Sequence, residues 1–143
     1  MCPEGNRLSA KNYFDTYAPV VTWFAIRLLT ICAIVINWQL CQVEFIMAYA
    51  QAPIKCDMYL QLPDGIYTEL DNSSIHVLKL LQNVYGQKQT GKVWANFLSE
   101  NIFKIGFEKS NIYKCVFYCN NLVFLVYVDG GIFSPWTGCQ LTV

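Results

Sequence analysis

The stretch LVFLVYVDGGIF, residues 122–133, is the part of the sequence that most strongly indicates a fold. Leu122–Val128 is a continuous apolar run of strand length, and Asp129–Gly131 contains the Asp-Gly pair that is typical of a tight turn. Ile132–Phe133 is apolar again and can return as a second strand. The pattern predicts an antiparallel β-hairpin with a carboxylate near its tip.

Further segments on the N-terminal side of this hairpin carry secondary-structure signals. Residues 18–40 form a long apolar stretch, which we expect to be a largely buried helix, and its apolar positions recur at helical spacing at Phe24, Leu28, Ile31, Val35 and Trp38. Strands are predicted at 42–49, 58–62, 77–81 and 115–118, and a helix at 93–104 that Gly106 ends. This order predicts an α+β fold, an antiparallel sheet with packed helices.

The composition is unusually apolar for a chain of 143 residues, with 55% hydrophobic and 14% charged residues. It excludes a disordered chain, and it argues against an independent soluble domain, in which about a quarter of residues are charged. One explanation is a small membrane protein with a span at 18–40, although Arg27 near the centre would cost about 2.5–3.5 kcal/mol. We favour the other explanation, a part of a larger fold with no membrane span, which should be poorly soluble in isolation.

The cysteines and the charges narrow the function classes. Seven dispersed cysteines without a C-x-x-C pair, together with a single histidine, indicate neither a disulfide framework nor a zinc site. Free thiols and a polar N-terminus without a signal-peptide core predict an intracellular protein, in a cytoplasmic particle or the nucleus, that is not secreted. Six lysines gather between Lys79 and Lys114, where they could contact phosphates or form a solvated face.

Two acids lie at or inside predicted apolar strands. Glu44 lies inside the strand at 42–49, and Asp129 follows the apolar run at 122–128. A carboxylate in such a place is costly to desolvate unless it is paired or binds a cation. Two carboxylates that converge from neighbouring strands would make a divalent-metal site of the kind that nucleotidyl transfer uses. The simpler alternatives are a turn aspartate at Asp129 and a solvent-facing strand acid at Glu44.

A series of ordered motifs resembles the reverse transcriptase of copia-type retrotransposons. The first is Tyr17–Val21 followed by Ile26–Leu29, and a longer run at Gln42–Ile54 resembles the first catalytic motif. The later segments are Asp57–Ile66, Leu78–Gln89 with Trp94, and Tyr127–Asp129. The resemblance covers residues 13–133, with a polar segment at 1–12 before it and an irregular tail at 134–143 after it.

The resemblance implies the palm and partial fingers of a right-hand polymerase that makes DNA on an RNA or DNA template-primer from dNTPs with Mg²⁺. It places Glu44 and Asp129 as catalytic residues that bind metal together with the backbone carbonyl of Phe45. It also implies nucleotide-binding roles, which fall on Tyr49, Gln89 and Lys92.

Two departures from the family pattern bear on activity. Gly130 stands where the hairpin motif has its second aspartate, and Glu44 replaces an aspartate. A shift of about 1 Å in a reacting group can cost roughly 100-fold in rate, and magnesium tolerates poor geometry badly. We therefore expect an impaired or inactive fragment that lacks the thumb and ribonuclease H parts of a parent polyprotein. A non-catalytic nucleic-acid-binding remnant that uses Lys79–Lys114 stays as an alternative.

Overall fold

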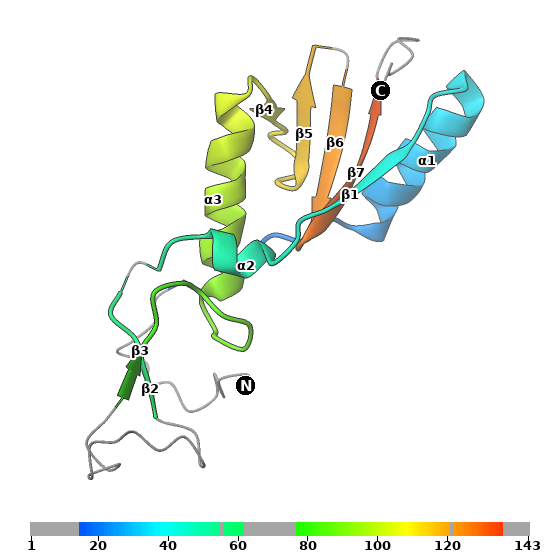
Figure 1. Cartoon of the computed structure of the whole chain (residues 1–143). Coiled ribbons are helices and arrows are strands. Elements are labelled where there is room, and N and C mark those ends of the chain that lie inside the picture. The colour runs from blue at the N-terminus through cyan, green and yellow to red at the C-terminus, as the bar shows by residue number, and fades with distance from the viewer. Residues whose placement is uncertain (1–14, 55, 62–76, 121, 136–143) are drawn as a thin grey trace.

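A computed structural model describes residues 15–54, 56–61, 77–120 and 122–135 (Figure 1). Helices and strands mix along the chain, and the strands pair antiparallel, as the α+β prediction requires. The elements are α1 (Trp23–Ile36), β1 (Cys41–Glu44), α2 (Ala48–Gln51), β2 (Tyr59–Gln61), β3 (Val77–Lys79), α3 (Thr90–Lys104), β4 (Glu108–Lys109), β5 (Val116–Cys119), β6 (Leu122–Tyr127) and β7 (Gly130–Pro135).

A five-stranded sheet in the order β1-β7-β6-β5-β4 forms the centre of the molecule. The predicted hairpin is confirmed as β6 and β7, but its turn is shifted. Tyr127 pairs with Gly130, so the two turn residues are Val128 and Asp129 rather than Asp129–Gly131. The turn is therefore tighter than the sequence suggested, and Gly130 already belongs to a strand.

Helix α3 packs on one face of the sheet. Trp94, Leu98 and Ile102 recur every four residues and are buried against Phe117 and Phe124. The helix begins at Thr90, before the predicted start at residue 93, because the Thr90 hydroxyl is buried and donates to the Val84 carbonyl and to Gln87 Oε1 at 3.2 and 2.9 Å. It ends as predicted before Gly106, whose φ of 93° favours glycine.

Helix α1 packs on the other face and corrects the prediction of a largely buried helix. It is 14 residues long, from the Thr22 cap to Asn37 in the left-handed conformation, and it buries Ala25, Leu29 and Ala33. The predicted core positions point elsewhere: Phe24 is 63% exposed and Val35 is 77% exposed. Because apolar residues surround this helix, periodicity could not select the buried stripe, whereas small alanines allow the backbone to approach the sheet.

The predicted strand at 42–49 is also wrong in its second half. β1 ends at Glu44, Met47 adopts φ 52°, and the chain turns into the short helix α2. Ala48 and Ala52 are fully buried in the cluster that contains Trp94. Packing of these alanines against α3 replaces continued pairing in the sheet.

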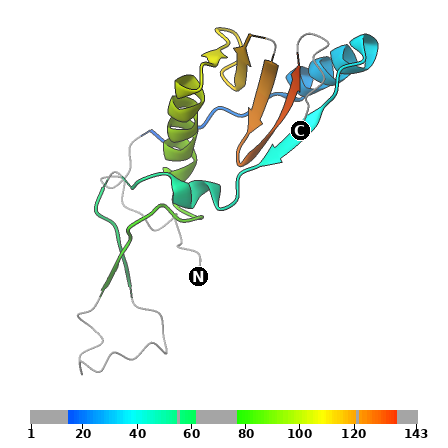
Figure 2. The same ribbon diagram turned by 45° about the horizontal axis from the view of Figure 1, so that its top comes forward.

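The second sheet, β2 with β3, is a two-stranded ribbon that projects from the main body (Figures 1 and 2). At the other end of the chain, β7 continues to Pro135, and buried Ser134 donates to the Gln39 carbonyl at 3.0 Å. Ser134 and Pro135 therefore belong to the sheet and not to an irregular tail. Residues 1–12 and 136–143 lie outside the described residues, as do residues 62–76 after β2.

Among the helices in the described ranges, none is long and apolar enough to cross a membrane. The span proposed at 18–40 is thus interrupted in the structure, since α1 covers only residues 23–36.

Candidate functional site

The end of β1 meets the turn of the β6–β7 hairpin, and this junction brings Glu44 close to the hairpin residues. Glu44 and Gly130 are direct cross-strand partners, and the Phe45 amide donates to the Asp129 carbonyl at 2.7 Å. Side chains of directly opposed residues lie on the same face of a sheet. The structure therefore brings together Glu44, Phe45, Asp129 and Gly130.

The hairpin turn is held from the other side by α3. Val128 has a φ of 48°, which is unfavourable for a β-branched residue, and the Trp94 indole N–H donates to its carbonyl at 2.6 Å. Phe45 packs edge-on against the same indole with ring centroids 5.5 Å apart. Trp94 is thus the side chain that fixes the turn and the start of the neighbouring loop.

Glu44 and Asp129 line one open hollow of about 460 Å³ on the α1 face of the sheet. Tyr127, Gly130 and Gln42 contribute to its floor, and Val21, Trp23 and Ile26 form its α1 side. Carboxylate and carbonyl oxygens are the donors that magnesium prefers, so the donor chemistry fits. Within the described residues, however, no group of three or more acidic, histidine or cysteine side chains gathers at one place. The donor set therefore amounts to two carboxylates and backbone oxygens.

Tyr49 of α2 lies within electrostatic reach of Asp129. Burial raises the pKa of the Tyr49 phenol above its ordinary value, and the charge of Asp129 and the neighbouring Tyr85 add to the effect. Its ring packs on Tyr85 at 4.4 Å between centroids. Tyr49 itself lines a separate hollow beside α3, together with Gly91 and Trp94, and not the one that Glu44 and Asp129 line.

Gln89 is placed differently. Its side chain is buried, and its amide nitrogen donates to the Met58 sulfur at 3.0 Å. Its amide oxygen finds no hydrogen-bond partner within the described part of the chain, and neither do Asn83 Oδ1 and Gln87 Nε2. These amide side chains form a buried polar cluster at the beginning of α3. The sequence signal for this cluster is the density of amide side chains after residue 82.

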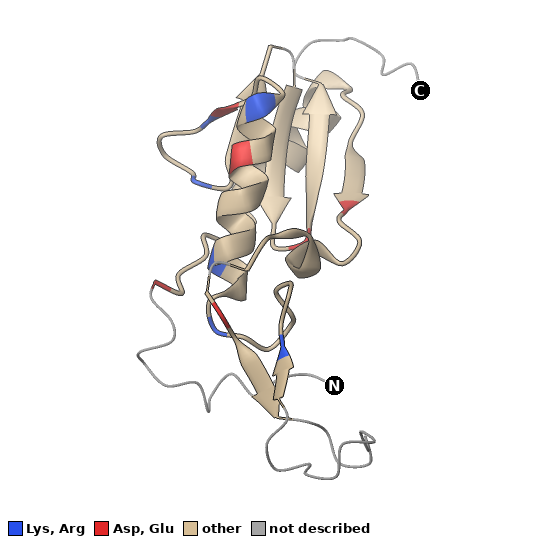
Figure 3. Ribbon diagram, turned by 60° about the vertical axis from the view of Figure 1, so that its left-hand side comes forward, with Lys and Arg blue, Asp and Glu red and all other residues tan. Residues whose placement is uncertain are grey.

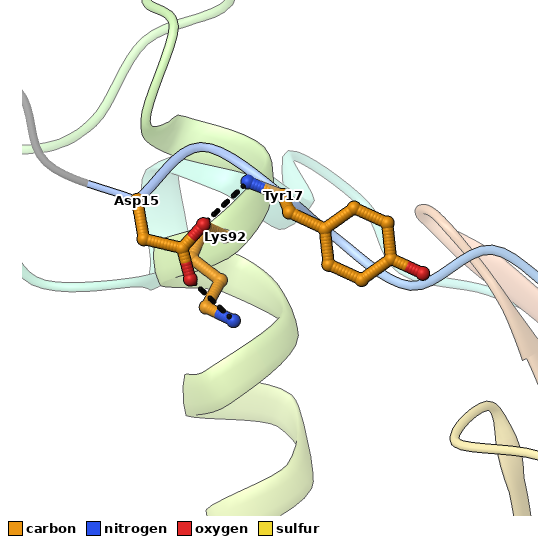
Figure 4. Close-up of polar contacts among 3 residues, drawn as sticks. All are labelled: Asp15, Tyr17 and Lys92. Carbon is orange, nitrogen blue, oxygen red and sulfur yellow. Dashed lines mark hydrogen bonds and ion pairs between the residues drawn. The ribbon is translucent and has the colours of Figure 1, made fainter.

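Lys92 faces away from the carboxylate hollow. It lies on the α3 side of the sheet, where its ammonium group is 3.1 Å from Asp15 Oδ2 (Figure 4). The other carboxylate oxygen of Asp15 accepts the Tyr17 amide at 3.0 Å. These two interactions hold the pKa of Asp15 below its ordinary value, with the amide hydrogen bond the larger cause. Lys92 is thus engaged with the N-terminal segment rather than with Glu44 or Asp129.

Comparison with known proteins places these features in context. A family model described as "Reverse transcriptase (RNA-dependent DNA polymerase)" matches residues 4–136. The chain is 28% identical over 128 residues to the retrovirus-related Pol polyprotein from transposon RE1 of Arabidopsis thaliana. This match covers 87% of the chain and 9% of the polyprotein.

Two further relatives are also transposon polyproteins. The Pol polyprotein from transposon RE2 of Arabidopsis thaliana is 26% identical, with 87% of the chain and 9% of the polyprotein covered. The transposon Ty1-ER2 Gag-Pol polyprotein of Saccharomyces cerevisiae is 26% identical, with 80% of the chain and 7% of the polyprotein covered. No solved structure matches the chain significantly. The chain thus spans less than a tenth of the length of these relatives.

Proposed function

The chain belongs to the reverse transcriptase (RNA-dependent DNA polymerase) family of copia-type retrotransposons, and from this premise we propose that it is the palm and part of the fingers of such a polymerase. The five-stranded sheet with α3 and the β6–β7 hairpin would be the palm, and the β2–β3 ribbon would belong to the fingers. The thumb and ribonuclease H parts would come from a parent polyprotein. The partners would be a template-primer and a dNTP.

The proposed reaction is template-directed deoxynucleotidyl transfer at the hollow that Glu44 and Asp129 line. Those two carboxylates and the Phe45 carbonyl would hold Mg²⁺. When bound, the metal activates the primer hydroxyl and neutralises the leaving pyrophosphate. Tyr49 would lie under the sugar of the incoming nucleotide, and the electrostatic effect of Asp129 on its phenol supports this role. Gln89 would need to turn its unpartnered amide oxygen toward the nucleotide.

Catalysis by this chain is proposed to be weak or absent. Gly130 is the cross-strand partner of Glu44, so the missing side chain is at the centre of the site and not at its edge. Two carboxylates hold less charge against divalent ions than three, and Glu44 places its oxygens one methylene further from the backbone than aspartate would. The pairing of Glu44 with Gly130 is the observation that carries this proposal.

Metal binding tests the site directly. We expect weak Mn²⁺ binding to the purified chain, measured by electron paramagnetic resonance, and a further loss in Asp129→Asn. Asp57→Asn is the matched control, because this substitution removes the same charge at a place away from the hollow. Asp57 is exposed and pairs with Lys79 of the β2–β3 ribbon. Equal affinity in the Asp129 variant and the wild type would show that the site is assigned wrongly.

Primer extension tests the activity. The purified chain should not extend oligo(dT) on a poly(rA) template with Mg²⁺, and extension would refute the proposed inactivity. In the full-length parent context, Glu44→Asp combined with Gly130→Asp should raise extension above that of the unaltered protein. If neither change has an effect there, the catalytic assignment fails.

A second candidate function is favoured by one observation. Lysines on the α3 side of the sheet line a polar hollow, which is separate from the carboxylates. A chain without polymerase activity could retain nucleic-acid binding at such a place.

A further inference from the structure

A polar hollow of about 430 Å³ lies beside α3 on the face of the sheet that does not carry Glu44. Three lysines from different segments line it: Lys92 from the first turn of α3, Lys109 from β4 and Lys114 from the loop before β5. Ser110, Asn96 and Asn111 add neutral polar groups. Figure 3 shows blue positions on α3 and on the loops beside it.

Among the described residues, the positive charge of this hollow is incompletely balanced. Asp15 pairs with Lys92, and Glu108 accepts a hydrogen bond from Tyr118. Glu108 and Lys109 are successive strand residues, so their side chains leave opposite faces of β4. Burial is the main cause that lowers the pKa of Lys109; Cys115 opposes the shift, and the charges of Lys114 and Lys92 add to it. An anion here would relieve the repulsion among the three ammonium groups.

The groups around the hollow are also oriented for an anion. The Lys109 ammonium group is positioned 5.3 Å from the centre of the Phe117 ring, which restrains its stem. Ser110 Oγ accepts the amides of Ile112 and Tyr113, each at 3.3 Å, and this leaves its hydroxyl hydrogen available to donate. The Asp15 carboxylate on Lys92 shows that an oxyanion is accommodated at this edge.

We propose that Lys92, Lys109, Lys114 and Ser110 form a binding site for a backbone phosphate of a single-stranded nucleic acid, with Asp15 as an internal competitor for Lys92. The choice of nucleic acid over a free phosphate rests on the proposed function. The site itself rests on the hollow and its charges. It lies across the sheet from Glu44 and Asp129, so it would anchor a strand outside the catalytic hollow.

Binding of a short fluorescein-labelled single-stranded DNA, followed by fluorescence anisotropy, tests this site. Lys114→Glu should weaken binding roughly fivefold at low salt, and the salt dependence should become shallower. Lys104→Glu is the matched control, because Lys104 is an exposed residue at the end of α3, outside the hollow, and the net charge changes equally. An equal loss in both variants would mean that net charge alone drives binding and would overturn the proposal.

A gain-of-binding variant separates the site from simple misfolding. Asp15→Asn should release Lys92 and tighten binding roughly threefold, as expected when a competing anion is removed. Glu100→Gln, which removes the same charge from the exposed side of α3, should have a smaller effect. No gain in Asp15→Asn relative to Glu100→Gln would contradict the proposed competition.

Two further arms identify the ligand and separate this site from the catalytic one. If inorganic phosphate binds as tightly as the oligonucleotide does, the nucleic-acid assignment is refuted. Lys114→Glu should leave Mn²⁺ binding unchanged, and Asp129→Asn should leave DNA binding unchanged. Loss of DNA binding in Asp129→Asn would place the strand at the catalytic hollow instead.

Discussion

The indole nitrogen of Trp94 lies 2.6 Å from the carbonyl oxygen of Val128 and donates a hydrogen bond to it. This bond joins the first turns of α3 to the tip of the β6–β7 hairpin, 34 residues further along the chain. Because Val128 holds a positive φ, its turn needs support from outside the hairpin. The position of the Asp129 carboxylate therefore depends on a helix residue that would not touch a substrate.

Replacement of Trp94 by Phe should destabilise the protein and loosen the proposed metal site. Trp94 is 2% exposed, so the loss combines one hydrogen bond with a packing defect, about 1–3 kcal/mol in total. Thermal unfolding monitored by circular dichroism measures the effect. Trp23→Phe is the control, since Trp23 is 72% exposed and its replacement should leave the midpoint nearly unchanged. Similar unfolding midpoints for both variants would refute the proposed role of Trp94 in supporting the hairpin turn.

Gly130→Asp should make the stability of the fold sensitive to a divalent cation. A Cβ atom at Gly130 would lie 3.0 Å from the Val43 carbonyl, and the new carboxylate would oppose Glu44 across the strand pair. Like charges directly opposite cost about 0.2–1 kcal/mol. We expect a lower unfolding temperature without metal and recovery with Mn²⁺.

Gly130→Asn separates crowding from charge in this experiment. Asparagine has nearly the same size as aspartate but no charge, so it should lose stability through the Val43 contact and gain nothing from Mn²⁺. Recovery of the Asn variant with metal would show that the cation acts elsewhere.

The exposed side of α1 should cause self-association of the isolated chain. Trp23, Phe24, Ile34 and Val35 are each more than 60% exposed, and they form an apolar surface of a size that soluble monomers rarely leave uncovered. Val35→Glu should reduce self-association, measured by sedimentation velocity, without lowering the unfolding temperature. Leu29→Glu, on the buried side of the same helix, should unfold the protein. A wild-type chain that stays monomeric at high concentration would contradict this prediction.

Cys115 should react with iodoacetamide more slowly than Cys56 at neutral pH. Burial raises the pKa of the Cys115 thiol above its ordinary value, although nearby Lys109 opposes the shift, and the side chain is covered by the α1 cluster. Cys56 is exposed. The raised pKa lowers the thiolate fraction of Cys115, and burial limits the access of the reagent to it. Peptide mass mapping during labelling measures the two rates, and equal rates would show that the α1 face is open.

The same pKa shift predicts the direction of an alkaline effect on stability. The folded state keeps the Cys115 thiol protonated to a higher pH than the unfolded chain does. The resulting contribution is fully present below the pKa of the unfolded thiol and is lost as pH rises through the raised folded value. Cys115→Ser should therefore flatten the alkaline decline of the unfolding free energy, and an unchanged slope would assign the decline to other groups.

Several features followed from local sequence. The hairpin was predictable because an apolar run, a turn pair and a second apolar run permit few other structures. α3 was predictable because its apolar residues recur every three or four positions against polar neighbours, and Gly106 ends it. The ordered motifs identified the family without any information about pairing, because each motif is a local string of residues.

Other features needed tertiary contacts. The buried stripe of α1 could not be read from a helix that is apolar on every side, and packing selected Ala25 and Ala33 since they allow close approach. The polar hollow beside α3 is lined by lysines from α3, β4 and a loop, so no local pattern encodes it. Its lysines were visible as a charge run, but their convergence was not.

The sequence by itself determined the family and the antiparallel character of the sheet. The tertiary structure decided that Gly130 faces Glu44, that Trp94 holds the turn and that Lys92 turns to the opposite side of the sheet. The physical reason is the range of the interactions. Turn and strand preferences act over a few residues, whereas register and the burial of a helix face depend on which distant surfaces exclude water together.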